Sequence, residues 1–241
     1  MRYHELGKTG YKVSYVAFGG VVSSQHFDKA VMPGDGQRSS DESVEWAIEN
    51  GINYFDVAPV YGDAQLLLGN SLQPHRKDVY LACKTNRREK EEAQKDLEES
   101  LRLLHTDYFD VYQLHGLTTL EEVETCFGPG GAMEVLEEAK KSGVARKLGI
   151  TAHGEEAALK ALEYYDFDTV MFPFNWHMHM GHNMGERLIR EAKKRGMGIL
   201  GIKSMVEHMD EVLDHPFSEE DRKKLEEHLE KVKERPFLEA I

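Results

Sequence analysis

The chain has 241 residues, which is enough for one large domain, and α/β barrels of this length occur undivided. Its formal net charge of −13 disfavours nucleic acid or an anionic membrane as a partner, and no apolar run approaches the roughly 20 residues of a membrane span. The N-terminus lacks the apolar core of a secretory signal, and Cys83 and Cys126 form no metal or disulfide pattern, so we expect a protein of the reducing cytoplasm.

The sequence begins with a predicted β-hairpin over residues 2–14, with Lys8-Thr9-Gly10 at its turn. After the hairpin, short apolar runs alternate with amphipathic stretches. The apolar runs predict strands at 15–19, 52–57, 79–84, 108–115, 147–151, 169–174 and 198–203. The amphipathic stretches predict helices from Ser40 or Asp41 to Gly51, and then at about 65–72, 90–104, 131–143, 155–165 and 184–195.

The predicted strands are continuous apolar runs, which indicates a parallel sheet covered on both faces. Seven strand–helix repeats predict an α/β fold of the (β/α)8 TIM-barrel type, one strand short, that forms a single domain over residues 1–241 with the hairpin at 1–14. Nothing after Val206 has the pattern of an eighth strand, and residues 207–241 are expected to form a C-terminal helical segment. The alternative is a doubly wound sheet, but its glycine-rich phosphate loop is not matched by Gly19-Gly20-Val21.

Polar residues stand at the ends of several predicted strands, where a barrel gathers its strand ends around one pocket. These residues are Asp56, Lys84, His115, Thr151 and Lys203. Tyr61 follows Asp56 in the next loop. Taken alone, Asp56 and Tyr61 have a plain structural explanation as a loop cap and a core tyrosine. The charged ends of the next two strands favour a functional site instead.

The four residues Asp56, Tyr61, Lys84 and His115 combine groups that suit one reaction. A phenol is a poor acid at neutral pH because its ordinary pKa is about 10, and a nearby ammonium group lowers that pKa by stabilising the phenolate. A carboxylate keeps the ammonium charged, and an imidazole can orient a carbonyl or relay a proton. We therefore expect reduction of a carbonyl group by a hydride donor, with Tyr61 as the acid.

Several stretches resemble the aldo-keto reductase superfamily, in order along the chain. They are the opening hairpin, FDVAPVYG with Asp56 and Tyr61, LACKT with Lys84, DVYQLHG with His115, KLGIT, and GILGIK. The resemblance implies a (β/α)8 barrel and NADPH-dependent reduction of aldehydes and ketones to alcohols. It implies that Tyr61 donates the proton, that Lys84 and Asp56 tune it, and that His115 orients the substrate. GPGGA before the fourth predicted helix is similar to a branch that often carries a C-terminal iron–sulfur extension, for which this chain lacks the cysteines.

The resemblance also implies which residues contact the cofactor and the substrate. The cofactor would be NADPH, with NADH possible, and the partner a small-molecule carbonyl compound. The residues expected to bind the cofactor are Gly19, Gly20, Thr151, His153, Asn175, Lys203 and Ser204. The residues expected to line the substrate site are Phe27 and Trp176.

Some positions depart from the family pattern. Met171 and Phe172 stand where family members have polar residues that hold the nicotinamide amide, and Ile202 stands where an aromatic side chain often stacks on it. The basic loop that grips the 2′-phosphate follows strand 8 in the family, and no such strand is found in this sequence. The alternative function is therefore a catalytically impaired, truncated homologue that binds a cofactor or another ligand.

A histidine-rich segment offers a further hypothesis. His177, His179 and His182, interspersed with methionines, could bind a soft metal such as copper. No carboxylate or cysteine completes the set, so we expect residues of the substrate loop or the surface and no metal site. A metal-dependent barrel hydrolase would need His-x-His on the first strand, which this chain lacks.

Overall fold

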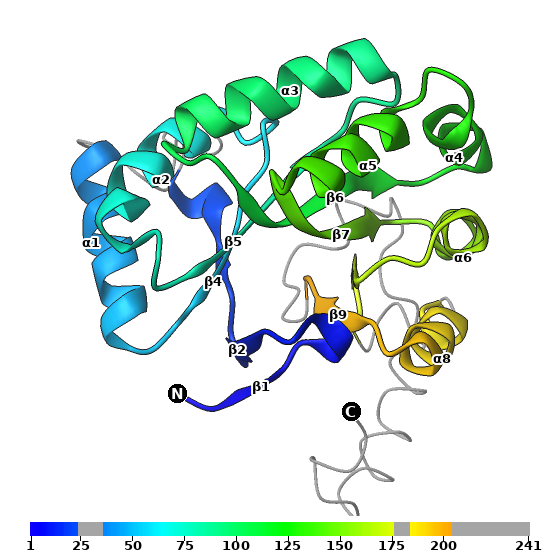
Figure 1. Cartoon of the computed structure of the whole chain (residues 1–241). Coiled ribbons are helices and arrows are strands. Elements are labelled where there is room, and N and C mark those ends of the chain that lie inside the picture. The colour runs from blue at the N-terminus through cyan, green and yellow to red at the C-terminus, as the bar shows by residue number, and fades with distance from the viewer. Residues whose placement is uncertain (24–35, 176–183, 204–241) are drawn as a thin grey trace, which may run out of the picture.

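The computed structural model describes residues 1–23, 36–175 and 184–203, and its centre is a curled sheet of parallel strands (Figure 1). The sheet consists of β3 (Phe18–Gly19), β4 (Tyr54–Asp56), β5 (Tyr80–Thr85), β6 (Phe109–Leu117), β7 (Ala145–Ala152), β8 (Thr169–Phe172) and β9 (Gly198–Gly201). Each strand pairs in parallel with the next one along the chain, so the spatial order is the chain order. This order is that of a barrel, and a doubly wound sheet would reverse direction partway. Among the described strands, β3 and β9 do not pair with each other, so the barrel is incomplete there.

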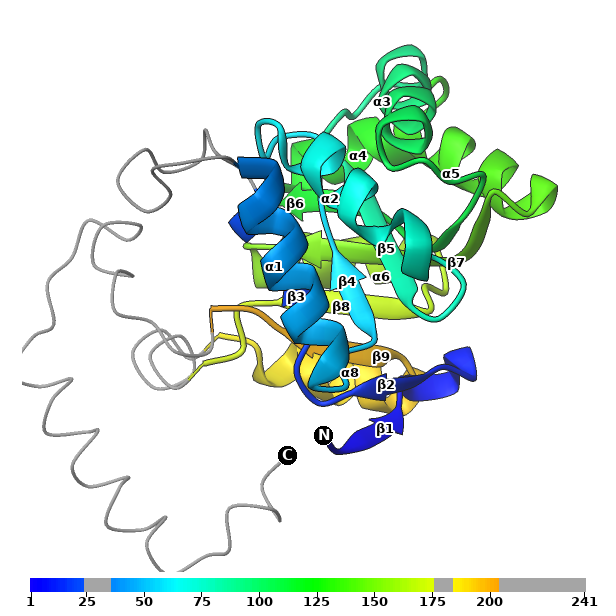
Figure 2. The same cartoon turned by 90° about the vertical axis from the view of Figure 1, so that its left-hand side faces the viewer.

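Helices cover the outer face of this sheet (Figures 1 and 2). They are α1 (Gly36–Glu49), α2 (Ala64–Leu72), α3 (Lys90–Leu103), α4 (Leu120–Phe127), α5 (Ala132–Ser142), α6 (Glu155–Tyr164) and α8 (Glu186–Arg195). Side chains that point outward from the strands, such as Phe55, Leu81 and Leu148, form one large core with these helices. Because the inner face is buried as well, the strands are largely apolar on both faces, as the sequence predicts. No helix in the three described ranges is long and apolar enough to cross a membrane.

The N-terminal hairpin covers the end of the sheet at which the amino ends of the strands lie. Strand β1 (Tyr3–Glu5) pairs antiparallel with β2 (Lys12–Ser14), and the turn contains the short 3-10 helix η1 (Gly7–Thr9). Its Leu6 and Val13 form a second cluster with inward side chains near the amino ends of the strands: Tyr54, Ala82 and Val111. A Cβ atom on Gly7 would lie 2.2 Å from the backbone nitrogen of Gly198, so only glycine allows this close approach to β9.

Three elements differ most from the expectations. The first strand of the sheet is only Phe18–Gly19, and Tyr15 and Val16 before it are exposed. Helix α1 spans Gly36–Glu49, so Ser40 lies inside the helix, where its hydroxyl accepts a hydrogen bond from Ser71. Helix α4 lies between β6 and α5 and was not predicted.

Candidate active site

Adjacent strands carry Asp56, Lys84 and His115 to the same end of the sheet. Asp56 is the last residue of β4, Lys84 lies near the end of β5, and His115 lies near the end of β6. Asp56 follows Tyr54 by two positions, and Lys84 follows Ala82 by two. Because Tyr54 and Ala82 point inward to the cluster with the hairpin, Asp56 and Lys84 point inward as well. They are 8% and 1% exposed, respectively. The carboxyl ends of the strands thus bring together three of the residues singled out from the sequence.

Lys84 and Asp56 form a buried ion pair, in which the Lys84 ammonium donates a hydrogen bond to Asp56 Oδ1. Burial lowers the pKa of Lys84, but the adjacent Asp56 carboxylate raises it, and the result is a pKa above the ordinary lysine value. Lys84 is therefore charged at neutral pH despite its burial.

Tyr61, in the loop after β4, lies half-buried beside this pair. The Lys84 Nζ atom is 5.6 Å from the centroid of the Tyr61 ring. Burial raises the pKa of the Tyr61 phenol, Lys84 opposes this effect, and the pKa ends above its usual value. Lys84 thus lowers this pKa, as expected from the sequence, but the larger effect of burial was not foreseen.

His115 completes the cluster. Its ring centroid is 5.9 Å from that of Tyr61, and the two rings are almost perpendicular, at 88°. Burial, with a further contribution from Lys84, lowers the pKa of His115 to about 3, so its imidazole is neutral in the physiological range. Arg88, in the loop after β5, donates hydrogen bonds to the backbone carbonyls of His115 and Gly116, at 2.9 and 3.3 Å, and so holds this part of β6.

Four residues expected to contact a cofactor lie at the carboxyl ends of β7, β8 and β9. They are Thr151, His153, Asn175 and Lys203. The Thr151 hydroxyl accepts a hydrogen bond from the backbone N–H of Gly116 at 2.7 Å, which ties β7 to β6. Asn175 Nδ2 donates to the backbone carbonyl of Lys203 at 3.0 Å, which ties the end of β8 to the end of β9. Burial and the nearby Lys203 lower the pKa of His153, so this imidazole is also neutral.

Gly19 and Gly20 lie beside Asp56 at the other edge of the site. Gly19 pairs with Asp56 in the register of β3 and β4. A Cβ atom on Gly20 would lie 2.9 Å from the carbonyl oxygen of Asp56, so a side chain there would push β4 away. Around Gly19 nothing described lies within 4 Å of such a Cβ position, which leaves open space on that side.

The remaining sequence-based residues lie outside the described ranges. They are Phe27, Trp176 and Ser204, together with His177, His179 and His182 of the metal hypothesis and the C-terminal segment 207–241. Within the described part of the chain, no group of three or more His, Cys, Asp or Glu side chains could hold a metal ion.

One buried residue of the site was missed from the sequence. Gln113, on β6, donates a hydrogen bond from Nε2 to Asp56 Oδ2 at 3.0 Å. The signal was available: Gln113 precedes His115 by two positions, and side chains two apart on a strand point to the same face.

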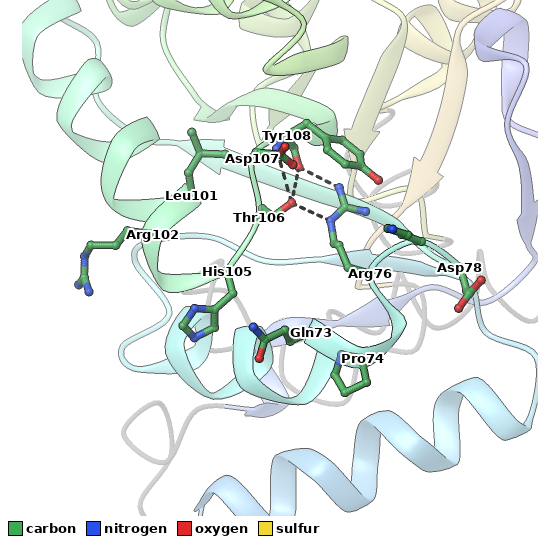
Figure 3. A pocket seen from close by; sticks show the side chains of 11 residues that line it. Gln73, Pro74, Arg76, Asp78, Leu101, Arg102, His105, Thr106, Asp107 and Tyr108 are labelled. Carbon is green, nitrogen blue, oxygen red and sulfur yellow. Dashed lines mark hydrogen bonds between the residues drawn. The ribbon is translucent and has the colours of Figure 1, made fainter.

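A surface pocket of about 850 Å³ lies at the opposite end of the strands (Figure 3). It is lined by η3 (Gln73–His75), the end of α3, and residues just before β5 and β6. Its Arg76 is engaged in the structure itself, since it hydrogen-bonds Thr106 and the carbonyl of Tyr108 and forms an ion pair with Asp110. None of the residues expected to be catalytic lies in this pocket.

The fold and the cluster define an α/β-barrel protein with a polar, enzyme-like site at the carboxyl ends of its strands. The sequence profile described as "Aldo/keto reductase family" matches residues 34–233. An uncharacterized oxidoreductase of Bacillus subtilis, YqkF, is 28% identical over 189 residues, which are 73% of this chain and 56% of that protein. L-galactose dehydrogenase of Arabidopsis thaliana is 30% identical over 210 residues, which are 81% of this chain and 62% of that protein.

Solved structures show the same fold. A Pseudomonas aeruginosa protein assigned to the aldo-keto reductases superposes with a TM-score of 0.72 at 23% identity, covering 86% of this chain and 80% of that one. A Bombyx mori aldo-keto reductase in complex with NADP gives a TM-score of 0.64 at 19% identity, covering 84% and 66%. The chain belongs to the aldo/keto reductase family. It spans between half and two thirds of the length of YqkF and of L-galactose dehydrogenase.

Proposed function

We propose that this protein is an oxidoreductase that reduces aldehyde or ketone groups to alcohols with a nicotinamide cofactor, and that Tyr61 donates the proton. The observation that carries the proposal is the placement of a buried, charged Lys84 in contact with Asp56 and 5.6 Å from the Tyr61 ring centroid. A buried ion pair is costly, and membership in a family of oxidoreductases gives this one a chemical reason.

In this proposal, Tyr61 gives its proton to the oxygen of the carbonyl group while that oxygen gains negative charge. The phenolate that remains is stabilised by the adjacent Lys84 ammonium. Asp56 keeps Lys84 charged and in place, since an uncompensated ammonium in this buried position would lose its proton. The raised pKa of Tyr61 keeps the phenol protonated before the reaction, as an acid must be.

His115 has a different role in the proposal. A neutral imidazole carries one N–H donor, and with a pKa of about 3 His115 keeps this form throughout the working range. Its ring stands against Tyr61, so a carbonyl oxygen that accepts the Tyr61 proton also comes close to the imidazole. We assign to His115 the orientation of the substrate carbonyl.

The cofactor would supply the hydride, and the chain offers suitable groups to hold it. Thr151, His153 and Asn175 offer hydroxyl, imidazole and amide groups for a carboxamide, and Lys203 offers a cation for a phosphate. Gly19, Gly20 and Ser204 are further candidates for cofactor binding, and Phe27 and Trp176 for substrate binding. NADPH is the cofactor we propose, with NADH as the alternative, and the NADP complex of the Bombyx mori relative supports this choice.

A second candidate function follows from the gap in the described sheet. Among the described strands β3 and β9 do not pair, and in the family the loop that grips the cofactor phosphate follows the strand that would lie between them. Without that loop the protein would bind a cofactor or another ligand without turnover.

The experiment is a titration of the purified chain with NADPH and with NADH, followed by tryptophan fluorescence, and then a test of NADPH consumption with a panel of simple aldehydes and ketones. Consumption with alcohol formation supports the reductase. Cofactor binding without consumption for any carbonyl contradicts it and supports the binding protein. Absence of binding to either cofactor contradicts the reductase and favours a protein that binds another ligand.

A further inference from the structure

Gln113 is fully buried in β6, yet none of the four proposed catalytic roles uses it. Its amide nitrogen donates to Asp56 Oδ2 at 3.0 Å, while Lys84 occupies the other carboxylate oxygen, Oδ1. We propose that Gln113 is a positioning residue of this site, which fixes the Asp56 carboxylate and, through it, the Lys84 ammonium. This inference rests on the proposed function and adds a residue to it.

The register of the sheet brings Gln113 to this place. Lys84 pairs with Gln113, Gln113 with Gly149, and Gly149 with Thr169, in one row across β5 to β8. Paired residues of neighbouring parallel strands point to the same face, so the Lys84, Gln113 and Thr169 side chains all point inward. The amide of Gln113 therefore lies next to the ion pair.

The neighbouring strand leaves space for this side chain at Gly149. A Cβ atom at that position would lie 3.1 Å from Cγ of Gln113 and 2.2 Å from Oγ1 of Thr169. Only a glycine lets both side chains lie over β7. Among the described residues, Oε1 of Gln113 has no hydrogen-bond partner, so the bond to Asp56 is what orients the amide.

A hydrogen bond from an amide stabilises the charged form of a buried carboxylate. Without the Gln113 donor, the ionised Asp56–Lys84 pair would be less stable relative to the neutral pair, and Lys84 would lose its proton more readily. The phenolate of Tyr61 would then lose part of its stabilisation, and the proton transfer would slow.

A second buried glutamine provides a matched control. Gln65, on α2, is 3% exposed and donates from Nε2 to Ser100 Oγ at 2.8 Å and to Cys83 Sγ at 3.3 Å. These contacts lie on the outer face of β5, away from the ion pair. The same substitution therefore removes a buried amide that contacts Asp56 at position 113 and one that does not at position 65.

The first test compares Gln113→Leu with Gln65→Leu, using NADPH and benzaldehyde or another carbonyl that the wild type reduces. We expect kcat of Gln113→Leu to fall about 10- to 100-fold with KM little changed, because the proton donor's partner is misplaced. Gln65→Leu should keep kcat within about two-fold of the wild type at equal folded fraction. Equal values of kcat for Gln113→Leu and the wild type would overturn the inference.

The second test is the pH profile of Gln113→Glu, which also decides the question if Gln113→Leu does not fold. A protonated glutamic acid can still donate to Asp56, whereas its carboxylate cannot and repels it. We expect kcat close to that of the wild type at low pH and a fall as the pH rises between about 5 and 9, a fall that Gln65→Glu lacks. A pH dependence of kcat in Gln113→Glu equal to that of the wild type would overturn the inference.

Other titratable groups around the pair do not produce this fall. They are Tyr54 and Tyr61 from β4 and the loop after it, Cys83 and Lys84 from β5, and His115 from β6. Burial raises the pKa of both tyrosines and of Cys83 and lowers that of His115 to about 3, while Asp56 holds the pKa of Lys84 above its usual value despite burial. The new carboxyl is thus the group that would titrate in this range.

Failure of the proposed function can be told apart from failure of this inference. If the wild type reduces no carbonyl compound, the proposed function fails, and the charge of Lys84 becomes the readout. Nitrogen NMR of its side chain, assigned with Lys84→Met, should show a lower pKa of Lys84 in Gln113→Leu and the wild-type pKa in Gln65→Leu. The same Lys84 titration in all three proteins would overturn the role of Gln113.

Discussion

At the scale of single residues, the Lys84–Asp56 pair links stability to chemistry. Lys84→Met leaves the Asp56 carboxylate buried without its counter-charge, and we expect a loss of about 3 kcal/mol in the free energy of unfolding. Adding Asp56→Asn should recover most of the lost free energy of unfolding, because no buried charge then remains unpaired. Carbonyl reduction should stay absent in both variants.

Urea unfolding of the wild type, Lys84→Met and the double variant measures this effect. A double variant no more stable than Lys84→Met would mean that the two charges do not depend on each other. Turnover close to that of the wild type in either variant would remove Lys84 from the proposed mechanism.

His115 makes stability depend on pH. Its pKa is lowered from 6.5 to about 3 by burial and then by Lys84, so below pH 6.5 the unfolded chain binds a proton that the folded chain does not. The contribution of neutral His115 to the free energy of unfolding is fully present above pH 6.5 and is lost as the pH falls toward 3. Between pH 7 and pH 5 the wild type should lose about 2 kcal/mol more than His115→Gln, measured by urea unfolding. Equal losses in the two proteins would show that His115 is not held neutral.

The sequence identifies residues of the site better than it predicts their energetics. Asp56, Lys84 and His115 were recognisable because each interrupts or ends an apolar strand. The spacing of Gln113 and His115 shows that both face the site, but the contact of Gln113 with Asp56 depends on the register between β5 and β6, which no local pattern reveals. The raised pKa of Tyr61 depends on how much of the phenol is buried, and this follows only from packing.

At the scale of elements, α4 is held by a capping box. The Thr119 hydroxyl accepts from the backbone N–H of Glu122, and the Glu122 carboxylate accepts from the backbone N–H of Thr119. Thr119→Ala should cost about 1 kcal/mol in the free energy of unfolding. Thr125→Ala, a threonine inside the same helix, should change it by less than about 0.5 kcal/mol. Thermal unfolding of the two variants compares them, and equal destabilisation would contradict the cap.

This element matters for the site because Glu122 also pairs with Arg88, whose guanidinium holds the carbonyls of His115 and Gly116. The capping box is visible in the sequence as Thr119-x-x-Glu122, so α4 could have been predicted from it. The shortened β3 could not, since Tyr15 and Val16 are apolar and only the folded structure leaves them exposed.

At the scale of the whole molecule, one end of the sheet carries the proposed active site and the other carries ion pairs that stabilise the fold. The site lies at the carboxyl ends of the strands, while at the amino ends Asp110 pairs with Arg76 and Arg146, and both guanidinium groups stack on Tyr108. The Arg76 side chain is 9% exposed and that of Arg146 is 51% exposed. Burial should therefore make Arg76 the more important partner.

Arg76→Leu should lower the free energy of unfolding by about 3 kcal/mol, and Arg146→Leu by less than about 1 kcal/mol. Neither should change kcat of the folded protein, because both lie far from the strand ends that carry the site. Urea unfolding and steady-state kinetics on the same preparations test both statements. A loss of kcat in Arg146→Leu at full folding would contradict the division between the two ends.

The barrel order of the strands was predictable because each apolar run is followed by a helix, which returns the chain to start a parallel neighbour. Seven such repeats in the sequence correspond to the seven strands of the parallel sheet. What lies between β3 and β9 was not predictable, because no strand pattern follows Val206; residues 204–241 lie outside the described ranges.

The most direct test of Tyr61 as the proton donor is the rate of carbonyl reduction by Tyr61→Phe, with NADPH affinity measured on the same sample. We expect kcat to fall by about 10²- to 10⁴-fold, the usual contribution of a general acid, while NADPH affinity stays within a few-fold of the wild type. Tyr112→Phe, which removes a buried phenol hydroxyl from the outer face of β6, serves as the control and should keep its kcat. Turnover by Tyr61→Phe equal to that of the wild type would show that Tyr61 is not the proton donor.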